Sequence, residues 1–225
     1  MPIPLQMISF DVFGTLIDVR GGSYAAFERI LRDANAPGID VKAFWEAWEE
    51  RNIEAYWAPY RPYKEICRDS LAAAFEAFGV HGRPETISHF FDAFPGFELF
   101  ADVTETLDLL SRRFDLAIVS NIDDDLLAAT PLKRKFDLVC TAERAKGYKP
   151  DGTLFRYLLA NSMFSIEEIV HAGQSQYTDM VGAKPLGITV AWINRRGVAL
   201  DPKVPAPDFR FSDVKSLLHF MKMEY

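Results

Sequence analysis

The sequence has few cysteines and no excess of basic residues. Its two cysteines, Cys67 and Cys140, lack the spacing of metal ligands and lie within apolar stretches. They predict buried, reduced thiols rather than a disulfide framework. The 25 Lys and Arg residues are outnumbered by 32 Asp and Glu, which gives a net charge of -7. This balance disfavours nucleic acid as a partner, although one buried Lys or Arg can still attract a small anionic substrate.

Long hydrophobic segments and repeats are also missing. No run approaches about 18 apolar residues, and the first residues lack the basic and then apolar pattern of a signal peptide. We therefore expect a cytoplasmic protein that does not enter a membrane. Hydrophobic residues make up 49% of the chain and charged residues 25%, which is typical of globular proteins of one or two domains.

Five short apolar runs are spaced for a parallel sheet. Each is separated from the next by enough chain for a crossover helix, and helical patterns such as Phe27, Ile30 and Leu31 fill the gaps. The pattern predicts an α/β fold with a Rossmann-like parallel sheet. The expected strands are residues 5–10, 116–119, 138–140, 169–172 and 188–193.

A long helical segment follows the first expected strand. Roughly 80 residues there contain helical patterns but no convincing strand, far more than the dozen or so that a crossover needs. Pro37-Gly38 breaks this segment between two helices, and Pro95-Gly96 marks the return to the sheet. We expect an α/β core formed by residues 1–16 and 96–225, with a helical cap inserted at 17–95.

Asp11 is the first candidate for chemistry. It directly follows the first expected strand, and open parallel sheets bind ligands at the carboxyl edge of their strands. An aspartate at the end of a strand can equally cap a turn. The position alone leaves both interpretations open, so the rest of the chain has to decide between them.

Four motifs follow one another along the expected core: FDVFGTL at residues 10–16, Ser120-Asn121, Lys149-Pro150-Asp151, and GQSQYTD at residues 173–179. Each is weak alone, but together they span the core. In this order they resemble the motifs of the haloacid dehalogenase-like hydrolases. The resemblance implies a Rossmann-like core, an inserted helical cap and a carboxylate nucleophile at Asp11.

Two positions favour dehalogenation over phosphate-ester hydrolysis. Phosphatases of this superfamily usually carry a second Asp two positions after the nucleophile, which protonates the leaving alcohol, whereas this chain has Phe13. Halide leaves without a proton. The phosphatases also place a carboxylate where the neutral Gln174 stands. Without that carboxylate, a magnesium site in this chain would be weaker. The resemblance is therefore closest to (S)-2-haloacid dehalogenases of type II, with no cofactor expected unless a phosphatase activity requires magnesium.

The resemblance also assigns roles to individual residues. Asp11 would attack the α-carbon of a short 2-haloalkanoic acid and form an ester, which water then hydrolyses. Lys149 would keep Asp11 ionised, and Asp179, oriented by Gln174 or Gln176, would activate or position the water. The expected catalytic residues are Asp11, Thr15, Lys149 and Asp179. The expected substrate-binding residues are Phe13, Ser120, Asn121, Gln174, Gln176 and a cap arginine, with Arg51 slightly favoured over Arg61.

Three other functions stay open at this point. They are a magnesium-dependent phosphatase, a hydrolase that opens a strained ring of a related small acid, and a homologue that binds a ligand without turnover. The expected partner is a small anionic substrate, and relatives that dimerise imply a homodimer as a further expectation.

Several conspicuous residues have an ordinary structural interpretation. The cap aromatics, such as Trp45, Trp48 and Tyr56, are expected mainly to pack with each other. Asp123-Asp124-Asp125 is expected to cap and charge the start of a helix. Arg195-Arg196-Gly197 is expected to form an exposed loop, and no histidine is assigned to catalysis.

Overall fold

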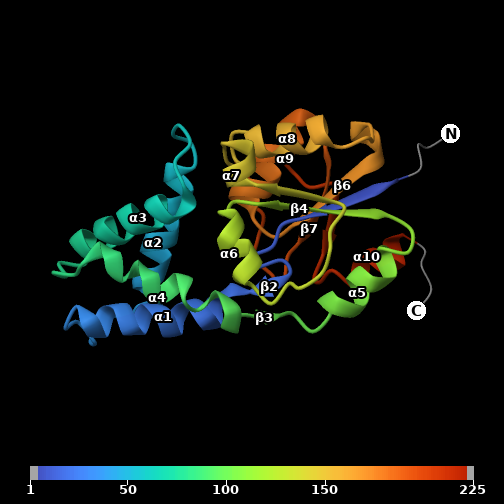
Figure 1. Cartoon of the computed structure of the whole chain (residues 1–225). Helices are drawn as coiled ribbons and strands as arrows, with labels where there is room; N and C mark the ends of the chain where they lie inside the picture. The colour runs from blue at the N-terminus through green and yellow to red at the C-terminus, as the bar shows by residue number, and fades with distance from the viewer. Residues whose placement is uncertain (1–4, 222–225) are drawn as a thin grey trace.

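The computed structural model describes residues 5–221 (Figure 1). Within this range six strands form one sheet in the order β5-β4-β1-β6-β7-β8, and all neighbouring pairs are parallel. This confirms the expected α/β class. The strands are β1 (Met7–Phe10), β4 (Asp115–Ser120), β5 (Leu138–Thr141), β6 (Ile169–Gly173), β7 (Thr189–Ile193) and β8 (Phe209–Phe211). The short edge strand β8 was not expected.

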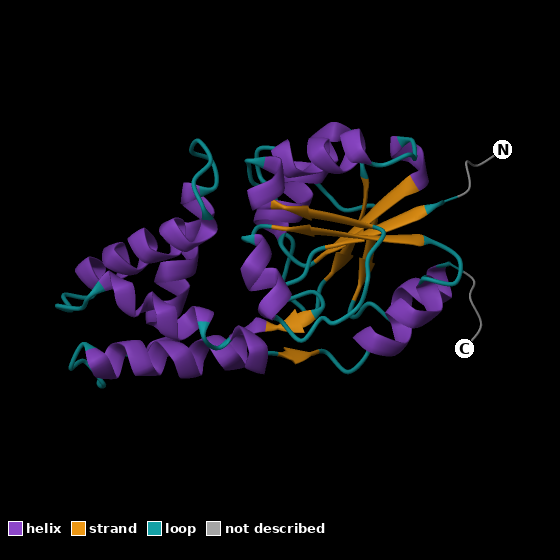
Figure 2. Cartoon of the chain, in the orientation of Figure 1, coloured by secondary structure: helices purple, strands orange, loops and turns teal. Residues whose placement is uncertain are grey.

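Helices lie on both faces of this sheet and in a separate group beside it (Figure 2). The α-helices are α1 (Val19–Asp33), α2 (Val41–Ala55), α3 (Tyr63–Ala77), α4 (Ser88–Phe91), α5 (Val103–Leu110), α6 (Asp124–Ala129), α7 (Ala142–Ala145), α8 (Thr153–Asn161), α9 (Val181–Ala183) and α10 (Ser216–Phe220). Shorter helical turns are η1 (Pro84–Ile87), η2 (Phe94–Gly96), η3 (Ile166–Glu168), η4 (Gln176–Met180) and η5 (Lys184–Leu186). Within the described range no helix has both the length and the hydropathy to cross a membrane.

The sheet is buried on both faces, as the near-continuous apolar strands require. Successive residues of a strand point to opposite faces, so Met7 packs in the core with α8 and α9 while Ile8 packs in the core with α5 and α10. Figure 1 shows α8 and α9 on one side of the strands and α5 and α10 on the other. This double cover leaves the strand ends as the place where polar side chains can gather.

The helices α1 to α4 form the separate group, on the left in Figure 1. Their core is aromatic: the Phe27 ring lies 4.9 Å from Trp48 and 5.9 Å from Phe90, measured between ring centroids. The chain enters this group through β2 (Ile17–Asp18) and leaves it through β3 (Glu98–Leu99), and these two strands pair antiparallel. A cap with boundaries at 17 and 95 stays a prediction.

The carboxylate of Asp123 connects the loop after β4 to the helical group. Asp123 precedes α6, but its carboxylate accepts hydrogen bonds from the backbone N–H groups of Tyr63, at 2.9 Å, and Lys64, at 3.1 Å. These are the first residues of α3. The expectation that Asp123 caps its own helix is therefore wrong: its side chain caps a helix that lies 60 residues away in sequence.

Candidate active site

The carboxyl ends of three neighbouring strands bring the candidate residues together. Asp11 follows β1, Ser120 ends β4, and Gln174 follows β6, and all three line one cavity. The backbone N–H of Asp11 donates to the Ala172 carbonyl at 3.0 Å, which continues the β1–β6 pairing to the nucleophile position. Parallel pairing thus places side chains from distant motifs at one edge of the sheet.

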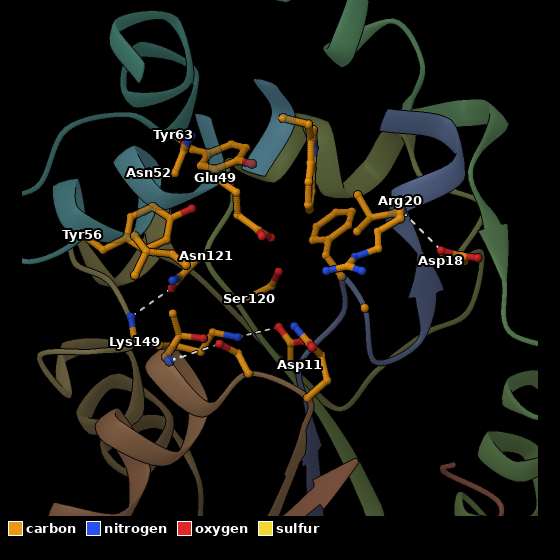
Figure 3. A pocket seen from close by; sticks show the side chains of 18 of the residues that line it. Asp11, Asp18, Arg20, Glu49, Asn52, Tyr56, Tyr63, Ser120, Asn121 and Lys149 are labelled. Carbon is orange, nitrogen blue, oxygen red and sulfur yellow. Dashed lines mark hydrogen bonds and ion pairs between the residues drawn. The ribbon is translucent and has the colours of Figure 1, made fainter. Parts of the chain in front are cut away.

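Asp11 is held by two buried partners. The Thr15 hydroxyl donates to Oδ2 of Asp11 at 2.7 Å. The Lys149 ammonium donates to Oδ1 at 2.5 Å, a contact drawn as a dashed line in Figure 3. Lys149 also lies 2.8 Å from Oδ1 of Asp179. Only 3% of the Lys149 side chain and 7% of the Asp11 side chain are exposed. One ammonium therefore serves two carboxylates in a place that water barely reaches.

Asp179 lies behind Lys149 and does not line the cavity. Its Oδ1 is 3.2 Å from Nε2 of His171, and its Oδ2 accepts the backbone N–H of Ser175 at 2.9 Å. Gln176 does not orient it, because that side chain bonds to the backbone of the segment at 199–201. His171 was missed by sequence reasoning and is fully buried. Its position on the strand β6, eight residues before Asp179, was the available signal.

Burial and mutual charge set the ionisation of this group. Burial raises the pKa of Asp11, and the charge of Asp179 adds to that rise, while Lys149 opposes it. Burial also opposes ionisation of Asp179, but Lys149 and His171 outweigh it and hold the pKa of Asp179 below its usual value. For Lys149 burial disfavours the charge, yet the two carboxylates prevail and raise its pKa. The lysine is therefore a fixed cation.

Close packing fixes the Lys149 backbone. Oδ1 of Asn121 accepts the Lys149 N–H at 2.9 Å, so the second and third motifs are tied together. On the other side, a Cβ atom on Gly182 in α9 would lie 1.9 Å from the Lys149 carbonyl oxygen, so only glycine allows this approach. Gly173 has a similar role, since a Cβ there would lie 2.4 Å from Cγ of Asp179.

The cavity above Asp11 has a volume of about 330 Å³, at the small end of the usual range for ligand pockets. Its floor comes from the sheet edge and its roof from the helical group. Phe13 lies in its wall and packs edge-on against Phe94, with ring centroids 5.5 Å apart. The Ser120 hydroxyl is buried in the floor without a hydrogen-bond partner among the described residues, so it is available to a ligand.

The cavity includes six of the expected site residues and leaves out four. Thr15 contacts Asp11 and Asp179 contacts Lys149, and neither of them lines the cavity itself. Gln176 bonds to a neighbouring loop, and Arg51 is exposed and pairs with Glu54 at 2.7 Å. Arg51 is therefore not placed to bind a ligand in this cavity. The six that line it are Asp11, Phe13, Ser120, Asn121, Lys149 and Gln174.

Other arginines take the place expected for Arg51. Arg20, Arg195 and Arg196 line the cavity. The guanidinium of Arg195 is already engaged, because it makes two 3.0 Å contacts with the Asp102 carboxylate and donates to the Thr15 carbonyl at 2.9 Å. The expectation of an exposed loop is wrong for Arg195. Its place directly after β7, at the same edge as Asp11, was the signal that could have found it.

The helix α2 contributes further polar residues that were missed. Glu49 and Asn52 line the cavity together with Trp45, Trp48 and Tyr56. These positions recur at three- and four-residue steps and so share one helix face. Two polar residues on an otherwise aromatic face are a sequence signal that was available. The aromatics themselves serve both as cap packing and as cavity wall.

The donor set offers a divalent cation little negative charge. Among residues 5–221, no group of three or more His, Cys, Asp or Glu side chains is arranged to hold a metal. Two carboxylates of this group, Asp11 and Asp179, both contact the Lys149 ammonium, which already neutralises part of their charge. Gln174 adds no charge at this edge.

The comparisons with known proteins agree with this architecture. Residues 8–193 match the family model described as haloacid dehalogenase-like hydrolase. The chain therefore belongs to the haloacid dehalogenase-like hydrolase family.

Individual relatives and structures are similar over nearly the whole chain. The (S)-2-haloacid dehalogenase 4A of Burkholderia cepacia is 25% identical over 221 residues, 94% of this chain and 89% of that protein. The phosphoserine phosphatase of Thermus thermophilus is 28% identical over 247 residues, 95% of this chain and 98% of that protein. The structure of L-2-haloacid dehalogenase from Xanthobacter autotrophicus with chloropropionic acid covalently bound has a TM-score of 0.82 at 20% identity, covers 97% of this chain and 98% of that one, and shows the shared fold.

Proposed function

We propose that the protein hydrolyses the carbon–halogen bond of short 2-haloalkanoic acids through an ester on Asp11. The observation that carries this proposal is the Asp11 carboxylate, held by Thr15 and Lys149 at the floor of the cavity with Phe13 instead of an acid beside it. A halide needs no proton to leave, so this arrangement suits its displacement. The (S)-2-haloacid dehalogenase relatives support the same activity.

In the first step an Asp11 oxygen attacks C2 of the acid opposite the carbon–halogen bond. A carbon–oxygen bond forms, and the halide departs with the bonding electrons. Thr15 and Lys149 aim the carboxylate, and Lys149 favours its ionised form against the effect of burial. The Ser120 hydroxyl and the Asn121 amide lie in the same cavity and supply hydrogen bonds to the substrate.

In the second step water attacks the carboxyl carbon of the Asp11 ester. The carbon–oxygen bond to the carboxyl carbon breaks, one water proton ends on the 2-hydroxyl group of the product, and the other leaves as the acid that this hydrolysis releases. Asp11 returns as a carboxylate. Because Asp179 lies behind Lys149, we give it the role of positioning that lysine, which stays paired while Asp11 is esterified.

Halide release from a panel of 2-haloacids tests the proposal. The panel compares the wild type with Asp11→Asn and with the control Asp115→Asn. Asp115 begins β4, whereas Ser120 at the cavity ends it. Each is assayed with EDTA and with added Mg²⁺. Release that ignores EDTA and is lost only in Asp11→Asn supports the proposal. Failure of the wild type to release halide from any of the acids would contradict it.

A phosphatase is the second candidate, because a phosphoserine phosphatase is among the relatives. It would need a proton donor where Phe13 stands and a Mg²⁺ site, to which the neutral Gln174 contributes no charge. Phosphate release from phosphate esters that depends on Mg²⁺ would favour it. If both assays are silent, opening of a strained small ring or ligand binding without turnover remain to be tested.

The same proposal covers the partners, the cofactor requirement and the location of the protein. We propose a small anionic substrate, no cofactor, a cytoplasmic location and a homodimer. Light scattering on the purified protein tests the last of these, since a monomer mass would contradict it.

A further inference from the structure

Glu49 presents an unpaired carboxylate to the cavity. It lies in α2, and in Figure 3 its side chain points into the space above Ser120. It makes no hydrogen bond or ion pair with any residue of the described part of the chain. The opposite charges that act on it through space are those of Arg20 and Arg196. Burial raises the pKa of Glu49, and the two arginines only partly offset that rise.

Folding alone gives no reason to keep an acid at this position. The neighbours of Glu49 on the same face of α2 are Trp45, Asn52 and Ile53, and each of them lines the same cavity. An unpaired carboxylate against such a wall loses hydration without gaining a partner. By contrast, Glu50 is exposed on the outer face of the helix, where water solvates it. A polar group that pairs only when the cavity is filled is typical of ligand recognition.

Two cations line the same cavity as Glu49. Arg20 and Arg196 both line it, and neither forms an ion pair with a described residue. Figure 3 shows the Arg20 guanidinium directed into the cavity from the start of α1. Arg195 differs, because Asp102 already occupies its guanidinium. The cavity therefore offers positive charge for a carboxylate and, at Glu49, an acceptor for a hydrogen-bond donor.

We propose that Glu49 selects small acids that carry a hydroxyl or ammonium group on the carbon next to the reacting one. This inference rests on the proposed function for the reaction at C2, above Asp11. The substrate carboxylate lies toward Arg20 and Arg196, and the additional donor bonds to Glu49. A plain 2-haloalkanoate leaves Glu49 unpaired, so the protein discriminates against it. A hydrogen bond to a charged group corresponds to a preference of about tenfold or more.

Binding of three acids tests this recognition without any turnover. Lactate, glycerate and isoserine share the 2-hydroxy acid frame and differ at C3, which carries hydrogen, hydroxyl or ammonium. Titration calorimetry measures each Kd for the wild type, Glu49→Leu, Glu49→Gln and the matched control Glu50→Leu. Circular dichroism and the melting temperature show whether each variant is folded, and Glu49→Gln retains the shape of the side chain if the leucine variant is not.

The wild type and Glu50→Leu should bind glycerate and isoserine at least about tenfold more tightly than lactate. In Glu49→Leu all three acids should bind within about threefold of one another. Glu49→Gln should lose the preference for isoserine, because the charge is gone. Equal binding of the three acids by the wild type would overturn the inference. So would a preference that survives in the folded Glu49→Leu variant, or no binding of any of the acids.

Turnover separates this inference from the proposed function. Halide release from 2-chloropropionate and from 2-chloro-3-hydroxypropionate is measured with the same four proteins. If the wild type releases halide from both acids without preference, the dehalogenase proposal stands and the role of Glu49 fails. If the wild type releases none but shows the Glu49-dependent binding preference, the recognition role stands and the reaction assignment fails.

Discussion

The Lys149 ammonium lies 2.8 Å from Oδ1 of Asp179, an aspartate that the cavity never touches. The negative charge of Asp179 also contributes to the raised pKa of Asp11. The aspartate of the fourth motif thus holds Lys149 in place and raises the pKa of Asp11 without contacting the cavity.

The first prediction concerns the acid limb of the kcat/KM profile. Protonation of Asp11 removes the nucleophile, so activity falls as the pH drops through its pKa. Replacing Asp179 by Asn removes a negative charge that raises this pKa, so the acid limb should move to lower pH although the rate is reduced. An acid limb that stays in place or moves to higher pH would show that Asp11 does not respond to Asp179.

Lys149→Met should destabilise the protein strongly. It leaves two buried carboxylates without their shared partner, and such losses cost about 3 kcal/mol or more of unfolding free energy at neutral pH. In the variant the pKa of Asp11 should rise further above its unfolded value and the pKa of Asp179 should rise toward its usual value, so the deficit should grow as the pH rises through that range and shrink in acid. Urea unfolding at several pH values measures it.

The matched control is Lys135→Met, an exposed lysine. Its unfolding free energy should stay within about 0.5 kcal/mol of the wild type. Equal effects of the two substitutions would contradict the shared ion pair.

The contact between Asp123 and the start of α3 predicts a local effect. Asp123→Ala removes the acceptor for the Tyr63 and Lys64 N–H groups and should cost about 1 kcal/mol. Hydrogen exchange should speed up at these two amides and little elsewhere. Asp125→Ala removes an exposed pair with Lys64 and should change little. Unchanged exchange in Asp123→Ala would rule out the cap.

Chelation should leave the activity intact. Because the Lys149 ammonium lies between Asp11 and Asp179, EDTA and added Mg²⁺ should each leave the kcat for halide release within about twofold of the untreated protein. Calorimetric titration with Mg²⁺ gives an independent check. Saturable Mg²⁺ binding that also raises kcat would contradict a reaction that needs no cofactor.

Much of the sheet could be predicted from the sequence because its buried strands are short apolar runs. The strands that were missed are those without such a run: β8 has three residues, and β2 and β3 have two each. Such short segments become strands because they pair with a neighbouring segment, and a sequence pattern does not report that pairing.

The site was predictable where it depends on strand ends and less so where it depends on helix orientation. Asp11, Ser120 and Lys149 come together because parallel pairing fixes the sheet edge. Arg51 and Glu49 are two residues apart on α2, which is about 200° around the helix, so only one of them can face the cavity. The resemblance implied a cap arginine and Arg51 was favoured, but the apolar pattern of α2 turns Glu49 toward the cavity and Arg51 away from it.

The central claim is that Asp11 becomes esterified, and a single turnover in water enriched in oxygen-18 tests it most directly. With the protein in excess over a 2-haloacid, the account predicts that the isotope enters the peptide containing Asp11, while the 2-hydroxy acid carries an oxygen from the carboxylate. Mass spectrometry of both species reads the outcome. Isotope in the hydroxyl group of the product and none in the peptide would mean that water attacks the substrate directly, and the account would be wrong.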